Sequence, residues 1–369
     1  MKILFINVVC GIKSTGRICT DLAEDLIKQG HDVKIAYGRG TVPEKYKDIS
    51  VRIGTDIDVL FHALGSKLFD KCGYGSKRAT KKFIRWAEGF DPDVLWLHNI
   101  HDHYINIFYL FDWIKTRPDM KVKWTQHDCW AFTGGCPYFT MSRCEQWKKE
   151  CFKCPSKHVS PKRVLLRNPN RNYHNKRLAF SGVENMELIT PSKWLKELIE
   201  ESFLNKYNTE VIYNKIDTGV FVKTKSDFKL KHGIENKIMI LGVAVPWSER
   251  KGLDDFVKLQ QIIDDRFRIV LVGLNDKQIK SLPKKIIGIK RTNSVEELVK
   301  IYSAADVFLN LTYEDNYPTV NLEAIACGTP CITYNTGGSP ESVPKENVIE
   351  VGNIEQGYSK IKDMFKGIL

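Results

Sequence analysis

The stretch that decides the fold is Leu311–Ser342, LTYEDNYPTVNLEAIACGTPCITYNTGGSPES. An apolar run, Val307–Leu311, leads into it and is short enough to be a buried parallel strand. A polar loop, Tyr313–Pro318, comes next, and the pattern then predicts a helix over Thr319–Ala326 and a second buried strand over Cys331–Tyr334. This order predicts a βαβ unit whose helix N-terminus offers unpaired N–H groups to an anion.

The length and composition predict a globular protein of two domains. The chain has 369 residues, of which 43% are hydrophobic. A chain of this length is longer than a domain with a single hydrophobic core usually is. No apolar run approaches the roughly 20 residues that span a bilayer. The start, Met1–Asn7, is too short for a signal peptide and is interpreted as a buried strand. We therefore expect a reducing, cytoplasmic compartment, where the ten cysteines are thiols or metal ligands.

The charge balance predicts an anionic partner. The formal net charge is +12, and nucleic acid, acidic lipid and a phosphorylated substrate would all complement it. Part of the excess lies in a basic segment, Phe61–Phe90, which is expected to be helical. Its cations are Lys77, Arg78, Lys81, Lys82 and Arg85. They form either an ordinary solvated face or a patch that contacts a membrane surface.

The first residues predict a Rossmann-like domain. A strand over Lys2–Val8 is followed by a loop that Gly11 and Gly16 bracket, and Arg17 stands at the start of the next helix. Ligands of such domains approach the carboxyl ends of the strands. The three-glycine dinucleotide fingerprint is absent, and no acid ends the second strand, Asp32–Tyr37. A nicotinamide-dependent dehydrogenase is therefore poorly supported.

Two further expected strands end in histidines. The strand over Asp93–Leu97 runs into His98, and the strand over Val122–Thr125 runs into His127 and Asp128. The carboxyl ends of parallel strands meet at one edge of a sheet. We therefore expect these side chains to face one cleft, although a lone histidine is more often structural.

Four cysteines follow within a segment rich in charged and aromatic residues. They are Cys136, Cys144, Cys151 and Cys154. The last two have the pair spacing of a zinc knuckle, so the four are candidate ligands of one structural zinc. The alternative is four unrelated thiols in a loop.

Two motifs resemble a known family. Asp315 and Glu323, with the run E-A-I-A-C-G-T-P from Glu323 to Pro330, resemble the nucleotide-sugar signature of retaining glycosyltransferases of family 4. The segment Trp124–Cys136, WTQHDCWAFTGGC, resembles a subfamily that assembles polysaccharides. The first acid departs from the family's usual Glu, since Asp315 stands there with Glu314 beside it.

The resemblance implies an α/β protein of the GT-B fold, with two Rossmann-like domains facing across a cleft. Residues 1–218 would form the acceptor-side domain, with a cysteine-rich insertion at about 136–177. Residues 219–354 would form the nucleotide-sugar-binding domain. A helix in residues 355–369 would cross back to the first domain.

The resemblance also implies the site residues. Catalytic roles fall to His127, Lys251 and Asp315. The implied donor-binding residues are Arg250, Lys251, Arg291, Glu314, Asp315, Asn316, Tyr317 and Glu323. The implied acceptor-side residues are Gly11, Gly16, Arg17, His98 and Asp128. Family members have an arginine where Val243 stands here, and Arg250 is the nearest substitute.

The implied function is retaining transfer of a sugar from a UDP- or GDP-sugar to a lipid-linked or saccharide acceptor. The product would be a bacterial surface polysaccharide such as capsule or O-antigen. No catalytic metal and no nucleic acid are expected, and the enzyme would be cytoplasmic and peripheral on the inner face of the membrane. Two alternatives stay open. One is a GT-B hydrolase or epimerase that acts on the nucleotide sugar alone, and the other is a zinc-containing nucleic-acid-binding protein.

Overall fold

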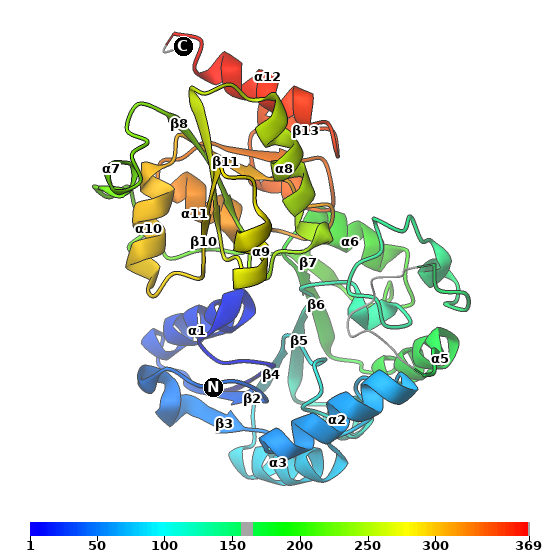
Figure 1. Cartoon of the computed structure of the whole chain (residues 1–369). Coiled ribbons are helices and arrows are strands. Elements are labelled where there is room, and N and C mark those ends of the chain that lie inside the picture. Colours follow the sequence, from blue (N-terminus) through cyan, green and yellow to red (C-terminus); the bar gives the residue numbers. More distant parts are fainter. Residues whose placement is uncertain (156–164, 368–369) are drawn as a thin grey trace. The chain divides into compact units, whose positions relative to one another are not determined.

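A computed structural model describes residues 1–155 and 165–367, and the chain divides into two compact units (Figure 1). Unit 1 is Met1–Tyr213 and unit 2 is Asn214–Leu369. The boundary expected from the sequence lies a few residues later, at 218. Each unit consists of a parallel sheet with helices on its faces, which is the α/β architecture expected from the sequence.

Unit 1 is built on a seven-stranded sheet in the order β3-β2-β1-β4-β5-β6-β7. The strands are β1 (Lys2–Asn7), β2 (Asp32–Tyr37), β3 (Ser50–Arg52), β4 (Val94–Leu97), β5 (Lys121–Thr125), β6 (Met186–Thr190) and β7 (Thr209–Val211). Every pair is parallel, and Ile3 of β1 stands between Val33 of β2 and Val94 of β4. The strand order reverses between β1 and β4, and such a reversal opens a ligand crevice at the carboxyl ends of the strands.

The helices of unit 1 cover both faces of this sheet. They are α1 (Lys13–Lys28), α2 (Asp56–Phe69), α3 (Lys77–Phe90), α4 (Ile107–Lys115), α5 (Pro169–Phe180) and α6 (Lys193–Glu200). Because side chains alternate along a strand, Phe5 packs with Cys19 of α1 on one face. On the other face Leu4 shares a core with Val59 of α2 and Phe83 of α3. Thus α2 and α3 cover the same side of the sheet.

The segment Phe61–Phe90, expected as one helical stretch, contains a break. Asp70 and Gly73 have φ of 54° and 85°, which a right-handed helix does not tolerate. His62 of α2 holds the turn, since the N–H groups of Gly73 and Gly75 both donate to its Nε2 over 3.1 Å. The break therefore rests on a histidine that precedes it by more than two helical turns.

Unit 2 repeats the plan with a six-stranded sheet in the order β10-β9-β8-β11-β12-β13. Its strands are β8 (Ile238–Val243), β9 (Phe267–Val272), β10 (Ile286–Ile289), β11 (Val307–Asn310), β12 (Cys331–Tyr334) and β13 (Val348–Ile349). Its helices are α7 (Phe228–Lys231), α8 (Leu253–Ile262), α9 (Asp276–Ser281), α10 (Val295–Ala304), α11 (Thr319–Ala326) and α12 (Ile354–Met364). The order reverses between β8 and β11, and α11 and β12 have the bounds expected from the sequence.

The last helix belongs to unit 2. Ile354 and Ile361 of α12 are buried in the unit 2 core, and the helix packs against α8. The crossing back to the first domain that the resemblance implies for residues 355–369 stays a prediction, while the face of α12 with Ile354 and Ile361 packs within unit 2.

Two glycines of unit 2 allow backbone segments to cross closely. A Cβ on Gly252, which has φ of 71°, would lie 2.0 Å from the carbonyl oxygen of Leu311. A Cβ on Gly273, which has φ of 97°, would lie 2.1 Å from the carbonyl oxygen of Ala244. Both crossings lie at the carboxyl ends of the strands, so they draw the loops after β8, β9 and β11 together.

We predict that Gly252→Ala destabilises unit 2 far more than Gly233→Ala does. Gly233 also has a positive φ, 62°, but nothing lies within 4 Å of its added Cβ. Gly233→Ala should therefore cost about 1 kcal/mol, from the dihedral alone. Gly252→Ala should cost about 3 kcal/mol or more, because the crossing must also open. Urea unfolding of both variants measures the difference, and equal losses would contradict the role given to the crossing.

Candidate active site

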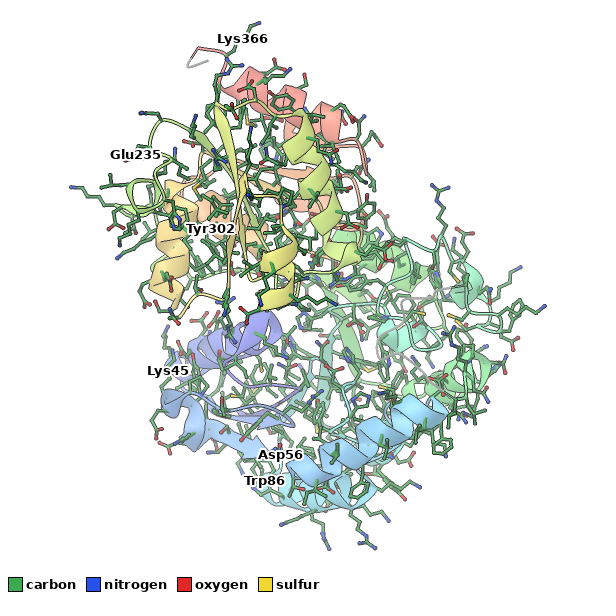
Figure 2. The ribbon with its side chains drawn as sticks, viewed as in Figure 1. Lys45, Asp56, Trp86, Glu235, Tyr302 and Lys366 are labelled. Carbon is green, nitrogen blue, oxygen red and sulfur yellow. The ribbon has the colours of Figure 1, made fainter. Side chains whose placement is uncertain are left out.

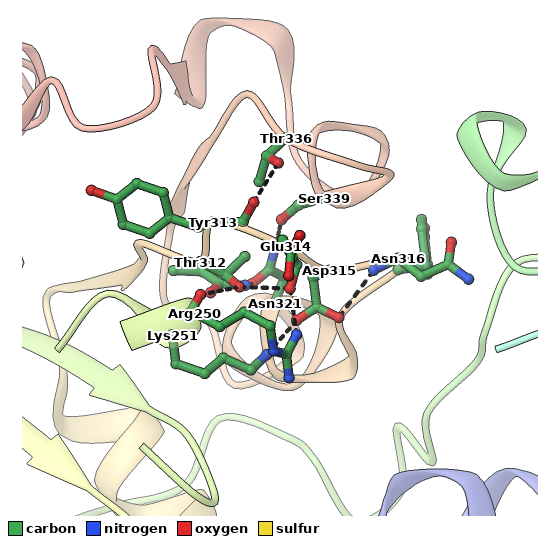
Figure 3. Close-up of polar contacts among 12 residues, drawn as sticks. Arg250, Lys251, Thr312, Tyr313, Glu314, Asp315, Asn316, Asn321, Thr336 and Ser339 are labelled. Atoms are coloured by element: carbon green, nitrogen blue, oxygen red, sulfur yellow. Dashed lines mark hydrogen bonds and ion pairs between the residues drawn. The ribbon is translucent and has the colours of Figure 1, made fainter. Parts of the chain in front are cut away.

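An ion pair joins the two loops that flank the strand reversal of unit 2. The Nζ of Lys251, on the loop after β8, lies 2.5 Å from Oδ2 of Asp315, on the loop after β11 (Figure 3). Both side chains are mostly buried, with 18% and 16% of their surface exposed. These are two of the residues to which the sequence assigns catalysis, and the structure brings them into contact.

Arg250 fixes the same two loops to each other. Its guanidinium donates to the carbonyl oxygen of Glu314, as Figure 3 shows. Its own carbonyl oxygen accepts from the N–H of Tyr313 at 2.8 Å and from Oγ1 of Thr312 at 3.2 Å. Arg250 is the nearest substitute for the arginine that family members have at the position of Val243. It therefore lies beside the ion pair of Lys251 and Asp315.

The electrostatics favour the carboxylate form of Asp315, whereas burial lowers the pKa of Lys251 below its usual value although Asp315 acts to raise it. Burial alone would raise the pKa of Asp315, but the Lys251 ammonium and the Arg250 guanidinium outweigh burial and hold this pKa below its usual value. Of the two acids left open by the sequence, Asp315 is the one whose carboxylate faces Lys251. Glu314 is 7% exposed and contributes its carbonyl oxygen to Arg250.

A glycine pair after β12 closes over the Asp315 loop. A Cβ on Gly337, which has φ of 56°, would lie 1.9 Å from the carbonyl oxygen of Asp315, and the N–H of Gly338 donates to that oxygen over 3.3 Å. Oγ1 of Thr336 donates to the carbonyl oxygen of Tyr313 at 2.9 Å. These residues are not among the site residues expected from the sequence. The sequence feature that could have identified them is the glycine pair, Gly337 and Gly338, that follows the buried strand β12.

Two of the helices that begin at this edge, α8 and α11, have no side-chain caps. The N-caps of α8 and α11 are Gly252 and Pro318, and neither makes a side-chain hydrogen bond to the helix. By contrast, Ser294 and Asn353 cap α10 and α12 with such bonds. Uncapped N–H groups are available to an anionic ligand, and the helix dipole favours negative charge there.

The other donor-binding candidates divide into two groups. Asn316 adjoins the pair, since its N–H donates to Oδ1 of Asp315 at 3.0 Å, and half-buried Tyr317 follows it. Glu323 is 2% exposed on α11 and accepts from the hydroxyl of Tyr302 at 3.1 Å. Figure 2 labels Tyr302 inside unit 2. Arg291 is exposed after β10, and within the described residues no hydrogen bond or ion pair joins it to the cluster.

Unit 1 brings two of its strand-end histidines together. Nδ1 of His98, after β4, lies 2.9 Å from Nε2 of His127, after β5, and the rings are stacked. His98 is 1% exposed and its ring also lies against Phe5 and Trp96. The expected meeting of the two strand ends is therefore present in the structure.

A third histidine, which the sequence analysis does not place in the site, adds charge to this edge. Nε2 of His101 lies 3.0 Å from Oδ2 of Asp128, and its Nδ1 lies 3.3 Å from Oδ1 of Asp102. The other carboxylate oxygen of Asp128 accepts from the N–H of Trp130 at 2.8 Å. The candidate Asp128 is thus held by His101 and by the backbone of Trp130. Its place directly after His127 is what indicated Asp128 as a site residue.

The three histidines differ in protonation. Burial lowers the pKa of His98 well below its usual value and lowers that of His127 to about 4. Burial would lower the pKa of His101 too, but the carboxylates of Asp128 and Asp102 outweigh it and hold this pKa well above its usual value. At neutral pH the edge therefore carries a neutral imidazole pair beside an imidazolium held by two carboxylates.

The loop after β1 contains the remaining acceptor-side candidates. The N–H of Gly11 donates to the carbonyl oxygen of Gly16 at 3.2 Å, and Gly11 has φ of 68°. Gly16 is buried and Arg17 half-buried on α1, whose N-cap, Ile12, offers no side-chain cap. The first helix of unit 1 therefore begins like α8 and α11, with N–H groups available at the strand reversal.

The four candidate zinc ligands line one small pocket, together with Phe139 and Trp147. The Sγ atoms of Cys136 and Cys154 lie 3.9 Å apart, which is close to the roughly 3.8 Å that two thiolates at about 2.3 Å from one zinc would have. The N–H of Gly134 donates to Sγ of Cys151 at 3.2 Å. Within residues 1–155 and 165–367, however, no group of three or more His, Cys, Asp or Glu side chains is arranged as a metal site. The zinc hypothesis stays a prediction.

Two family models match the chain. The model described as Glycosyltransferase Family 4 matches residues 15–220, more than half of the chain, and the model described as Glycosyl transferases group 1 matches residues 235–366. The putative colanic acid biosynthesis glycosyl transferase WcaC of Escherichia coli K12 is 22% identical over 358 residues, which are 94% of this chain and 86% of WcaC. N-acetyl-alpha-D-glucosaminyl L-malate synthase of Bacillus anthracis is 28% identical over 49% of this chain and 52% of its own.

Solved structures share the fold over nearly the whole chain. Sucrose-phosphate synthase of Thermosynechococcus elongatus superposes with a TM-score of 0.69 at 15% identity, covering 99% of this chain and 90% of that one. HepE of Anabaena, in complex with UDP-glucose, gives a TM-score of 0.63 at 14% identity, covering 99% and 89%. At these identities the likeness shows the fold.

We predict that acid destabilises the protein through the neutral histidine pair. Unfolded histidines bind protons below a pH of about 6.5, whereas folded His127 resists protonation down to about 4. Between these values the unfolded state binds more protons, so stability falls as the pH falls. In His127→Gln the slope of unfolding free energy against pH should decrease by up to about 1.4 kcal/mol per pH unit. Urea unfolding from pH 7 to 4 measures it, and an unchanged slope would contradict the assignment.

We predict about one zinc per chain in protein purified without added metal, held by the four cysteines. Elemental analysis measures the content. The variant Cys151→Ser should lose the metal, whereas Cys331→Ser should keep it, because Cys331 lies buried in unit 2. Metal-free protein with four titratable thiols in this segment would rule the zinc out.

Proposed function

The chain belongs to Glycosyltransferase Family 4 and has the GT-B fold, and on this premise we propose that it is a retaining enzyme of bacterial surface polysaccharide synthesis. It would transfer a sugar from a nucleoside diphosphate sugar to a lipid-linked or saccharide acceptor. The family, the α/β fold and the transferase class expected from the sequence are thereby confirmed. The donor, the acceptor and the stereochemistry belong to the proposal.

The observation that supports the proposal most strongly is the cation cluster at the strand reversal of unit 2. Lys251 and Arg250 lie on the loop after β8, which Gly252 brings against the loop after β11 that leads to the uncapped start of α11. A diphosphate needs such an arrangement of fixed cations and free N–H groups. We place the diphosphate of the donor there.

This arrangement suits the bond-breaking step. As the bond between the sugar and the diphosphate breaks, negative charge builds on the leaving group, and cations that are already fixed stabilise it without reorganisation. Asp315 holds the Lys251 ammonium at 2.5 Å, so the ammonium is in position before the donor arrives. The departing phosphate oxygen would accept the acceptor's hydroxyl proton, and no catalytic metal is required.

Glu323 would bind the ribose of the donor, and His127 would contact its transferred sugar. The Glu323 carboxylate, which accepts one bond from Tyr302, has further lone pairs for a ribose hydroxyl. His127 would contact the transferred sugar as a neutral imidazole, with His98 holding its ring. Asp128 and His101 would fix the backbone around it.

The comparisons suggest which donors to test first. HepE structures contain UDP or UDP-glucose, so we propose a UDP-sugar as donor, with GDP-sugars as the next class. The relative named for colanic acid biosynthesis supports a saccharide acceptor of a surface polysaccharide. We further propose that a lipid carries this acceptor and that the enzyme is peripheral on the inner face of the membrane. No helix in residues 1–155 and 165–367 has the length and apolarity to cross a bilayer.

We predict that substitutions of Lys251, Glu323 and His127 have separable effects on turnover and on nucleotide binding. Lys251→Ala should lower kcat by about 10²–10³, because its charge matters most as the leaving group forms. Glu323→Gln should weaken UDP binding about tenfold or more, because a hydrogen bond to a carboxylate contributes about 1.5–3 kcal/mol. His127→Ala should lower turnover and leave UDP binding almost unchanged.

Calorimetry with the free nucleotide and a turnover assay measure these effects. Lys277→Ala, an exposed lysine on α9 of the same unit, is the matched control for loss of one positive charge and should change neither. Loss of UDP binding in His127→Ala, or unchanged binding in Glu323→Gln, would overturn the assignment of the residues. Release of free sugar at the same rate without any acceptor would indicate a hydrolase instead.

A further inference from the structure

Helix α2 of unit 1 presents large apolar side chains to solvent. Ile57, Leu60, Phe61 and Leu64 are 66%, 66%, 68% and 48% exposed, and Phe69 at its end is 42% exposed. The first four follow the helical spacing, so they form one continuous stripe. Isolated exposed apolar residues are common on protein surfaces, whereas a contiguous stripe usually marks a contact surface.

The inward face of α2 carries buried polar side chains beside the core residue Val59. His62, Ser66 and the capping residue Asp70 are 4%, 1% and 1% exposed. His62 accepts from Gly73 and Gly75, and its Nδ1 lies 3.0 Å from the hydroxyl of Ser76, which begins α3. The carboxylate of Asp70 accepts from the N–H of Asn168 at 2.8 Å.

These bonds fix which side of α2 faces outward. Rotating the helix to bury Leu60 and Phe61 would expel His62 and leave buried N–H groups of the following turn without acceptors, which is costly. The fold therefore keeps the apolar stripe exposed by means of specific polar contacts. Such an arrangement suggests that the stripe meets an apolar phase outside the protein.

The adjoining helix supplies the charge that identifies this phase. The α3 cations, Lys77, Arg78, Lys81, Lys82 and Arg85, are all exposed. Within the described residues none of them forms an ion pair with a carboxylate, and Lys81 lies over the ring of Tyr109. Because α2 and α3 pack on the same core and meet through His62 and Ser76, apolar and cationic surfaces adjoin. Figure 2 labels Asp56 at the start of α2 and Trp86 of α3 in this part of unit 1.

We propose that the outward face of α2 inserts into the interfacial region of an anionic lipid bilayer while the α3 cations contact its headgroups. An apolar stripe beside unpaired cations is the composition of helices that lie in a membrane interface. The proposal deepens the proposed function, on which it rests for the lipid-linked acceptor. It assigns insertion to α2, whereas the charge pattern in the sequence had pointed only to α3.

The two helices contribute differently to the binding. Attraction between cations and anionic headgroups is screened by salt, with a Debye length of about 8 Å at physiological ionic strength. Immersion of Leu60 and Phe61 removes apolar surface from water and is not screened. Binding should therefore have a salt-sensitive part that depends on α3 and a salt-resistant part that depends on α2.

Cosedimentation with vesicles tests this assignment. The vesicles contain phosphatidylcholine alone or with phosphatidylglycerol, and they carry no acceptor. Leu60→Gln/Phe61→Gln should weaken binding to the anionic vesicles at least about tenfold at high and low salt, since a buried Leu or Phe contributes about 1.5–3 kcal/mol when fully immersed. Arg78→Gln/Lys82→Gln should lower binding at low salt and flatten its salt dependence.

The control is Leu230→Gln in α7 of unit 2, where Leu230 has the same 66% exposure as Leu60, and it should bind as the wild type does. None of the changed side chains lies in the core, so the midpoint of thermal unfolding should stay unchanged. Conservative Leu60→Met/Phe61→Leu should restore the binding.

Three results would overturn the proposal. The first is full vesicle binding by Leu60→Gln/Phe61→Gln. The second is equal binding of the wild type to neutral and anionic vesicles. The third is a change from dimer to monomer in Leu60→Gln/Phe61→Gln, by light scattering without lipid, which would assign the stripe to contact between two copies of the chain. UDP binding by the wild type reports separately on the proposed function, because it needs no vesicle.

Discussion

The ion pair between Lys251 and Asp315 is the interaction on which the candidate donor site depends. Parallel strands deliver the loops that follow them to one edge of the sheet, and β8 and β11 are neighbours there. The pair then connects the two loops, Gly252 lets their backbones approach closely, and Gly337 lets the loop after β12 close over Asp315. Cations that would repel each other in an empty site are held in place by a carboxylate. The site is therefore organised before any ligand is present.

Unit 1 uses a different electrostatic arrangement at the same edge of its sheet. Two imidazoles are kept neutral by burial and a third is kept charged by two carboxylates. A neutral His127 can exchange hydrogen bonds with sugar hydroxyls without bringing a charge into the site. Charge is placed where a diphosphate would bind, in unit 2, and the histidine that would contact the sugar is neutral.

Much of this could be predicted from the sequence because the signals are local. The apolar run at Val307 and the stop after Ala326 predicted β11 and α11 within a residue. The pairing of His101 with Asp128 joins residues 27 positions apart and depends on the adjacency of two strands, so no local pattern contains it. The break between α2 and α3 was missed because it rests on His62, which reaches forward to Gly73 and Gly75. The crossing of the last helix to the first domain stays a prediction, since the structure shows that its face with Ile354 and Ile361 packs within unit 2.

The division of the chain between Tyr213 and Asn214 has a consequence for synthesis on the ribosome. Each sheet takes all its strands from one side of that division, so unit 1 has its full set once β7 has emerged, and it can fold while unit 2 is still being translated. Unit 2 must wait for α12, because Ile361 of that helix, 0% exposed, completes its core. A ribosome that stops short of α12 would release a folded first unit attached to a second with an open core, and quality-control proteases would be expected to degrade such a product from its C-terminal half.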